Sequence, residues 1–80
     1  MKDRSICVKV GRNIYRLRKG RSQGVIAGQA EISHSYLSLI ERGRKNVGIV
    51  LLDRIAQALG VQPEELFKDP LVPNLRNPKI

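Results

Sequence analysis

The sequence is poor in aromatic residues, cysteine and histidine. It holds two tyrosines, one phenylalanine and no tryptophan in 80 residues, so its core must be largely aliphatic. The single cysteine, Cys7, excludes an internal disulfide bond, and we interpret it as a small apolar residue that fills space. His34 is the only histidine, and no Cys/His cluster has the spacing of a zinc site. We therefore expect neither a metal nor a cofactor.

Long apolar runs are also missing. No run approaches the roughly 20 residues that span a bilayer, and the charged N-terminus lacks the apolar region of a secretory signal. There are no paired carboxylates, and no base–acid pair accompanies Ser33, Ser35 or Ser38 as a hydrolase would require. These absences favour a cytoplasmic protein that is not an enzyme.

Positive charge is what the sequence has in excess, and it is unevenly placed. The formal net charge is +8, and the isoelectric point is about 10.4. Residues 1–45 hold eleven Lys and Arg against three Asp and Glu, whereas residues 46–80 hold four of each kind. This asymmetry favours a polyanionic partner over the alternative of an ordinary solvated surface.

Apolar residues recur at helical spacing along most of the chain. The length suits one domain, which we place at residues 1–68, followed by a proline-containing tail at 69–80. The spacing predicts an all-α fold with five helices, at 8–19, 23–30, 34–42, 49–59 and from Pro63 onward. Ser22 and Ser33 are the expected N-caps. The expected core residues of the last two helices are Ile49, Leu52, Ile55, Ala56, Leu59, Leu66 and Phe67.

The second and third predicted helices have the spacing of a helix-turn-helix, centred on residues 23–42. Ala27 supplies the small residue needed where the two helices cross. Ile32 is the apolar residue that closes the junction after the turn. The remaining inner positions are also apolar, at Ile26, Ala30, Leu37 and Ile40.

Four segments carry a family resemblance: residues 11–18, Ser22 with Gln23, residues 35–43, and residues 55–61. Together they resemble the lambda-repressor/Cro-type (Xre) family of transcriptional regulators. Residues 36–61 are also similar to controller proteins of restriction–modification systems. The resemblance implies a five-helix domain that binds double-stranded operator DNA, usually as a homodimer on a palindrome.

The resemblance also implies roles for individual residues. Gln23 corresponds to a glutamine that contacts a DNA phosphate, and Glu41 to a glutamate that pairs with Arg18 or, alternatively, Arg16. Residues near the start of the third helix reach base edges in this docking mode. The implied base-reading residues are His34, Ser35, Ser38 and Leu39, and the implied backbone contacts are Gln23, Tyr36, Arg42, Arg44 and Lys45.

Four positions depart from the family pattern. Glu31 occupies a turn position that usually holds glycine and needs a positive φ, at a cost of about 1 kcal/mol. Gly24 and Gly28 lie inside the second helix, where each costs about 1 kcal/mol relative to alanine. We therefore expect this helix to be the least stable. Leu39 stands where the family often has a polar residue.

Two surplus apolar residues, Val50 and Leu51, lie near Val47 and predict a dimer interface. The alternative is that the tail covers them through Leu71 and Val72. The predicted function is that of a sequence-specific transcriptional regulator. One alternative is an antitoxin-type protein-interaction module that also binds DNA and uses the tail to hold its partner. The other is an RNA-binding or nonspecific nucleic-acid-binding protein, and the scarcity of aromatic side chains argues against stacking on single strands.

Overall fold

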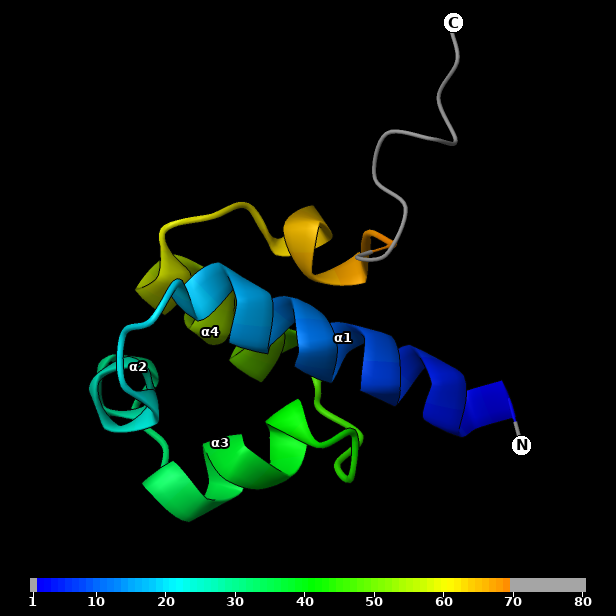
Figure 1. Ribbon diagram of the computed structural model, residues 1–80, viewed down its shortest axis with the longest axis horizontal. Coiled ribbons are helices and arrows are strands. Elements are labelled where there is room, and N and C mark those ends of the chain that lie inside the picture. Colours follow the sequence, from blue (N-terminus) through cyan, green and yellow to red (C-terminus); the bar gives the residue numbers. More distant parts are fainter. Residues whose placement is uncertain (1, 70–80) are drawn as a thin grey trace, which may run out of the picture.

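The computed structural model describes residues 2–69, with residues 2–4 described by backbone alone (Figure 1). It contains four α-helices: α1 (Lys2–Arg18), α2 (Gln23–Ala30), α3 (His34–Glu41) and α4 (Ile49–Leu59). A short 3₁₀-helix, η1 (Pro63–Phe67), follows. Residues 2–69 contain no strand, so the all-helical prediction is confirmed. The prediction of five α-helices is not, because the fifth element is a 3₁₀-helix.

The first helix is longer than its apolar pattern predicted. We expected residues 8–19, but α1 begins at Lys2. Ile6 lies one turn before Val10 and is 43% exposed, so the added turns contribute little to the core. The apolar pattern therefore did not mark the start of the helix. The helix ends at Arg18, and Lys19 and Gly20 then adopt positive φ values of 54° and 86°.

Serine caps begin the second and third helices, as predicted. The Ser22 hydroxyl accepts a hydrogen bond from the backbone N–H of Val25 at 3.1 Å. The Ser33 hydroxyl accepts one from the N–H of Tyr36 at 3.0 Å. Each cap satisfies a donor that has no partner within its helix. Between the helices, Glu31 adopts the positive φ expected at its position, 64°.

The helices enclose one aliphatic core. Helix α1 packs against α3, α4 and η1, whereas α2 packs against α3 and α4. Figure 1 shows α1 as the long helix beside which α3, α4 and η1 are arranged. All of the predicted inner residues of the helix-turn-helix are buried except Ile32, which is partly buried against the core. The buried core residues are Val10, Ile14, Leu17, Ile26, Ala27, Ala30, Leu37, Ile40, Leu52, Ile55, Ala56, Leu59 and Leu66.

Two predicted core residues are exposed instead. Ile49 is 81% exposed, because the buried stripe of α4 starts one turn later, at Leu52. Phe67 is 44% exposed, whereas its neighbour Leu66 is fully buried. A 3₁₀-helix has three residues per turn, so consecutive side chains point in well-separated directions. Leu66 therefore fills the core and Phe67 turns away from it.

The described helices do not include one that is long and apolar enough to cross a membrane. The predicted tail, with Leu71 and Val72, lies outside the described residues apart from Asp69.

Candidate nucleic-acid interface

The outward side of α3 carries all four residues predicted to read bases. His34, Ser35, Ser38 and Leu39 line one open hollow of about 360 Å³, together with Arg42. The side chains between them on the helix, Leu37 and Ile40, are buried in the core. The helix therefore presents its polar side to solvent, while its apolar side fixes it to the rest of the domain.

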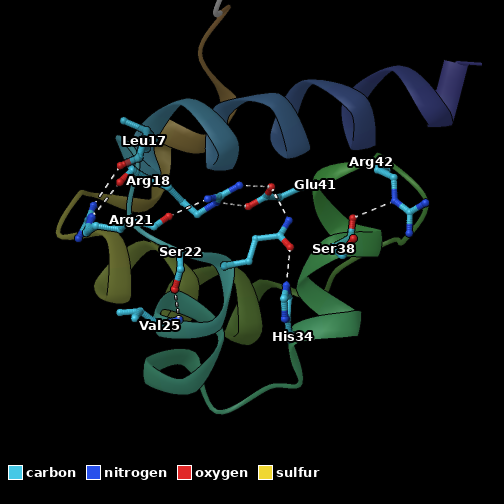
Figure 2. Close-up of polar contacts among 10 residues, drawn as sticks. Leu17, Arg18, Arg21, Ser22, Val25, His34, Ser38, Glu41 and Arg42 are labelled. Carbon is cyan, nitrogen blue, oxygen red and sulfur yellow. Dashed lines mark hydrogen bonds and ion pairs between the residues drawn. The ribbon is translucent and has the colours of Figure 1, made fainter.

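An ion pair holds the end of α3 against α1. Arg18 donates from Nε to Glu41 Oε2 at 2.6 Å and from Nη2 to Glu41 Oε1 at 2.9 Å (Figure 2). Of the two arginines considered, Arg18 is therefore the one that meets Glu41. The two side chains are only 12% and 6% exposed. The hydrogen bonds that Arg18 donates to Glu41 raise the pKa of the Arg18 guanidinium above its ordinary value, against the opposing effect of burial.

Gln23, the first residue of α2, extends this pair to the start of α3. Its Nε2 donates to Glu41 Oε1 at 2.8 Å. Its Oε1 lies 2.8 Å from Nε2 of His34. Gln23 is half-buried, so the amide that we expected at a phosphate joins three helices through Arg18, Glu41 and His34. We call these four side chains the polar chain.

Cationic side chains follow directly after α3. Arg42, Arg44 and Lys45 are all exposed. The Arg42 Nε donates to the carbonyl of Ser38 at 3.4 Å. The Lys45 ammonium lies 5.6 Å from the ring centroid of Tyr36, a distance within the range of cation–π attraction. Tyr36 itself is half-buried and packs against the core, so its ring is partly a packing surface.

The loop that carries these cations lies close against α1. Gly43 has a φ of 75°, and a Cβ atom there would lie 2.8 Å from Cγ2 of Val8. On the facing side, a Cβ at Gly11 would lie 2.5 Å from the carbonyl oxygens of Ile40 and Glu41. Both contacts need glycine, and together they fix how the end of α3 sits against α1.

Asn13 is a structural residue that the sequence reasoning missed. Its side chain is fully buried and donates to the carbonyls of Leu66 at 2.8 Å and Lys68 at 2.7 Å. Arg16 donates to Asn13 Oδ1 at 2.9 Å, so the side-chain oxygen of Asn13 also has a hydrogen-bond partner. The sequence signal that could have revealed it is a polar residue on the helix side that carries the apolar Val10, Ile14 and Leu17. The hydrogen bonds of Asn13 attach η1 to α1.

The residues predicted at a dimer interface differ in exposure. Val50 is 71% exposed, whereas Val47 and Leu51 are half-buried and pack against the core. Ile49, which we had placed in the core, joins Val50 on the surface. Beside Ile49 lies an apolar cavity of about 220 Å³ that Ile6, Phe67 and Val47 also line. This side of the domain therefore exposes more apolar surface than expected.

Comparisons with known proteins agree with this architecture. A family model described as a helix-turn-helix domain matches residues 13–67. The control protein C.MunI of a Mycoplasma species is 37% identical over 67 residues, which cover 80% of this chain and 90% of that protein. The control protein C.BamHI of Bacillus amyloliquefaciens is 34% identical over 68 residues, which cover 85% of this chain and 84% of that protein.

A solved structure shows the same arrangement of helices. The restriction–modification controller protein C.AhdI of Aeromonas hydrophila superposes with a TM-score of 0.75 at 38% identity, covering 79% of this chain and 98% of that chain. These relatives are regulators rather than enzymes. The chain thus belongs to the helix-turn-helix family of DNA-binding transcriptional regulators, and restriction–modification controller proteins are among its relatives.

Proposed function

We propose that this protein is a sequence-specific regulator that binds double-stranded DNA as a homodimer and reads the major groove with α3. The observation that carries the proposal is the hollow on the outward side of α3. It brings His34, Ser35, Ser38 and Leu39 together beside the cationic Arg42. Hydroxyl and imidazole groups suit base edges, and an apolar side chain such as Leu39 suits a thymine methyl.

The residues around the hollow suit contacts with the DNA backbone. Arg44 and Lys45 are exposed immediately after α3 and provide cationic groups for phosphates. Tyr36 and Gln23 complete the proposed set, and the N-terminus of α2 adds backbone N–H groups that favour an anion. Phosphate contacts supply much of the affinity and make it fall with salt concentration.

A homodimer would place two copies of α3 on one face of the duplex, about 34 Å apart. The proposed interface is the apolar side around Val47, Val50 and Leu51, extended by the exposed Ile49. Apolar surface of this kind marks interaction sites in soluble proteins. The Val50→Lys variant should dissociate in sedimentation experiments, whereas Gln62→Lys, at another exposed position, should remain dimeric.

Selection of binding sites from random duplex DNA, followed by sequencing, tests the whole proposal. A palindromic consensus is expected, because a two-fold dimer presents two identical reading helices. Competition with single-stranded RNA of random sequence tests the alternative of an RNA-binding protein. Equal affinity for that RNA, or selected duplexes without any consensus, would refute the proposal.

A further inference from the structure

The polar chain joins the buried ion pair of the domain to the first residue of the proposed reading helix. We infer that it fixes which ring nitrogen of His34 faces the DNA, and that His34 reads an exocyclic amino group, N4 of cytosine or N6 of adenine. The inference deepens the proposed function and rests on it. It follows from the directions in which the hydrogen bonds of the polar chain must run.

The ion pair sets the first direction. Arg18 donates to both carboxylate oxygens of Glu41, at 2.6 and 2.9 Å, so Glu41 is ionised and acts only as an acceptor. The Gln23 amide lies 2.8 Å from one of these oxygens. An amide oxygen there would set two acceptors against each other. The amide must therefore present its NH₂ group to Glu41.

This orientation decides the tautomer of His34. With its NH₂ group at Glu41, Gln23 presents Oε1 to Nε2 of His34 at 2.8 Å. A carbonyl oxygen only accepts, so Nε2 must carry the hydrogen. In the neutral ring the other nitrogen, Nδ1, is then left with a lone pair and no hydrogen. A contact made on the inner side of α3 thus determines the chemistry of an outer atom.

Nδ1 is available to an outside partner. Within residues 2–69 the ring makes its hydrogen bond through Nε2, and no group there bonds Nδ1. His34 is exposed and lines the hollow with Ser35, Ser38 and Leu39. Figure 2 shows its ring directed toward the polar chain at one end, which leaves the opposite edge of the ring outside the polar chain.

Because Nδ1 of His34 is an acceptor, it can bond only to hydrogen-bond donors on the base edges of the major groove. Cytosine N4 and adenine N6 are donors, whereas guanine N7 and O6 and thymine O4 are acceptors. Phosphate oxygens also only accept. Neutral His34 therefore matches an amino group and mismatches guanine, thymine and phosphate. Bonding to guanine or phosphate would require the protonated ring, in which both nitrogens donate.

The tautomer is tested in the free protein, without DNA. Because His34 is the only histidine, the imidazole ¹⁵N signals need no further assignment. At pH 8, long-range ¹H–¹⁵N spectra should give the pattern of a ring protonated at Nε2. A free imidazole also favours Nε2–H, but with a minor Nδ1–H form. The Gln23→Ala variant should therefore gain a detectable population protonated at Nδ1, and the control Gln29→Ala, on an exposed position of the same helix, should keep the wild-type pattern. A wild-type ring protonated at Nδ1 would overturn the inference.

The base preference is tested with modified DNA at pH 8. In the selected operator, purine replaces adenine, or 2-pyrimidinone replaces cytosine, so that only one amino group is removed at a time. At the one position per half-site where His34 contacts the base, removing the amino group should weaken wild-type binding by about fivefold, the effect of losing one hydrogen bond. The His34→Ala variant should be insensitive to the same replacement.

Guanine analogues provide the opposing outcome. Replacing guanine by 7-deazaguanine removes an acceptor, and the resulting loss should be the same in the wild type and in His34→Ala. If 7-deazaguanine weakens binding of the wild type but not of His34→Ala, His34 donates a hydrogen bond to guanine N7. That result would contradict the inference. Equal sensitivity of both proteins at every amino group would also overturn it. If no duplex sequence is selected, the proposed function fails and the base preference with it, while the tautomer is still decided by the spectra.

Discussion

The two sides of α3 use polar groups in opposite ways. On the inner side, Glu41 is 6% exposed, and its two oxygens accept from Arg18 and Gln23. On the outer side, the hydroxyls of Ser35 and Ser38 make no hydrogen bond within residues 2–69. Satisfied buried groups hold the helix in place, whereas unsatisfied surface groups are available to a ligand. Substitutions on the inner side should therefore change stability, and those on the outer side should change binding.

Removing the carboxylate of Glu41 should have the largest effect. The Glu41→Ala variant leaves the Arg18 guanidinium charged and without its partner in a site that is only 12% exposed. Breaking a buried ion pair from one side costs about 3–5 kcal/mol. Urea unfolding at a fixed protein concentration measures this loss.

A surface carboxylate provides the control for this loss. Glu64→Ala removes an exposed acidic group and should change the free energy of unfolding by less than about 0.5 kcal/mol. Replacing both partners, with Arg18→Met and Glu41→Leu together, should recover much of the stability because no charge is left unpaired. A Glu41→Ala variant as stable as Glu64→Ala would contradict the role of the inner side.

Asn13 extends the comparison to a buried polar residue whose hydrogen bonds join α1 to η1 and Lys68 instead of α3. Asn13→Ala leaves the carbonyls of Leu66 and Lys68 without their donor. Unsatisfied buried groups cost about 1–3 kcal/mol, so urea unfolding should show a loss in this range. The operator consensus should remain that of the wild type. A changed consensus would mean that the attachment of η1 also influences the reading surface.

The sequence predicted those parts of this arrangement that depend on local chemistry. The serine caps of α2 and α3 and the limits of α2 and α4 follow from neighbouring residues, and they agree with the structure. The inner residues of the helix-turn-helix follow from periodicity in the same way. The exposure of Ile49 could not be predicted, because residues 49–52 are all apolar and offer no contrast from which to choose a side.

The polar contacts were harder to predict, because they join residues far apart in the chain. Asn13 meets carbonyls 53 and 55 residues away, which no local pattern indicates. Gln23 was assigned to a phosphate from the family resemblance alone. Its contacts with Glu41 and His34 appear only once three helices are placed in space. The pairing of Glu41 with an arginine was open to prediction because a family pattern implied it.

On the outer side, Arg44→Ala should weaken binding to every duplex. Arg44 is exposed and is proposed to contact a phosphate, which carries no sequence information. Gel-shift titrations over a range of salt should show a loss of about fivefold and a log–log salt slope reduced by roughly one. Arg54→Ala, on an exposed position of α4, is the matched control and should bind like the wild type. A loss confined to the selected operator would contradict a phosphate contact.

Ser35→Ala should instead change sequence preference. Its hydroxyl lies in the hollow of α3, and deleting it should relax the selected consensus at one position per half-site by about 1 kcal/mol. Affinity for random duplex should stay the same, as should the urea midpoint. The measurement is a repeated site selection with the variant. An unchanged consensus together with weaker binding to all duplexes would move Ser35 from the bases to the backbone.

The smallest effect is expected at Glu31, in the turn between the two helices of the motif. Its φ of 64° and ψ of 42° are left-handed, a conformation that costs a non-glycine residue about 1–2 kcal/mol. Its carboxylate also stands at the negative end of the α2 dipole. Glycine removes both costs but loses about 0.5–1 kcal/mol through its freedom in the unfolded chain. Glu31→Gly should therefore raise the free energy of unfolding by about 0.5–1 kcal/mol.

Glu31→Ala separates the two causes, because alanine removes the charge and keeps the strained backbone. If strain dominates, alanine should bring little gain in urea unfolding and glycine should bring most of it. Equal gains would assign the effect to the dipole instead. Neither variant alters the hollow of α3, so the operator consensus should stay unchanged in both. The turn then belongs with the inner side of α3, where a substitution acts on the stability of the domain and leaves its reading surface intact.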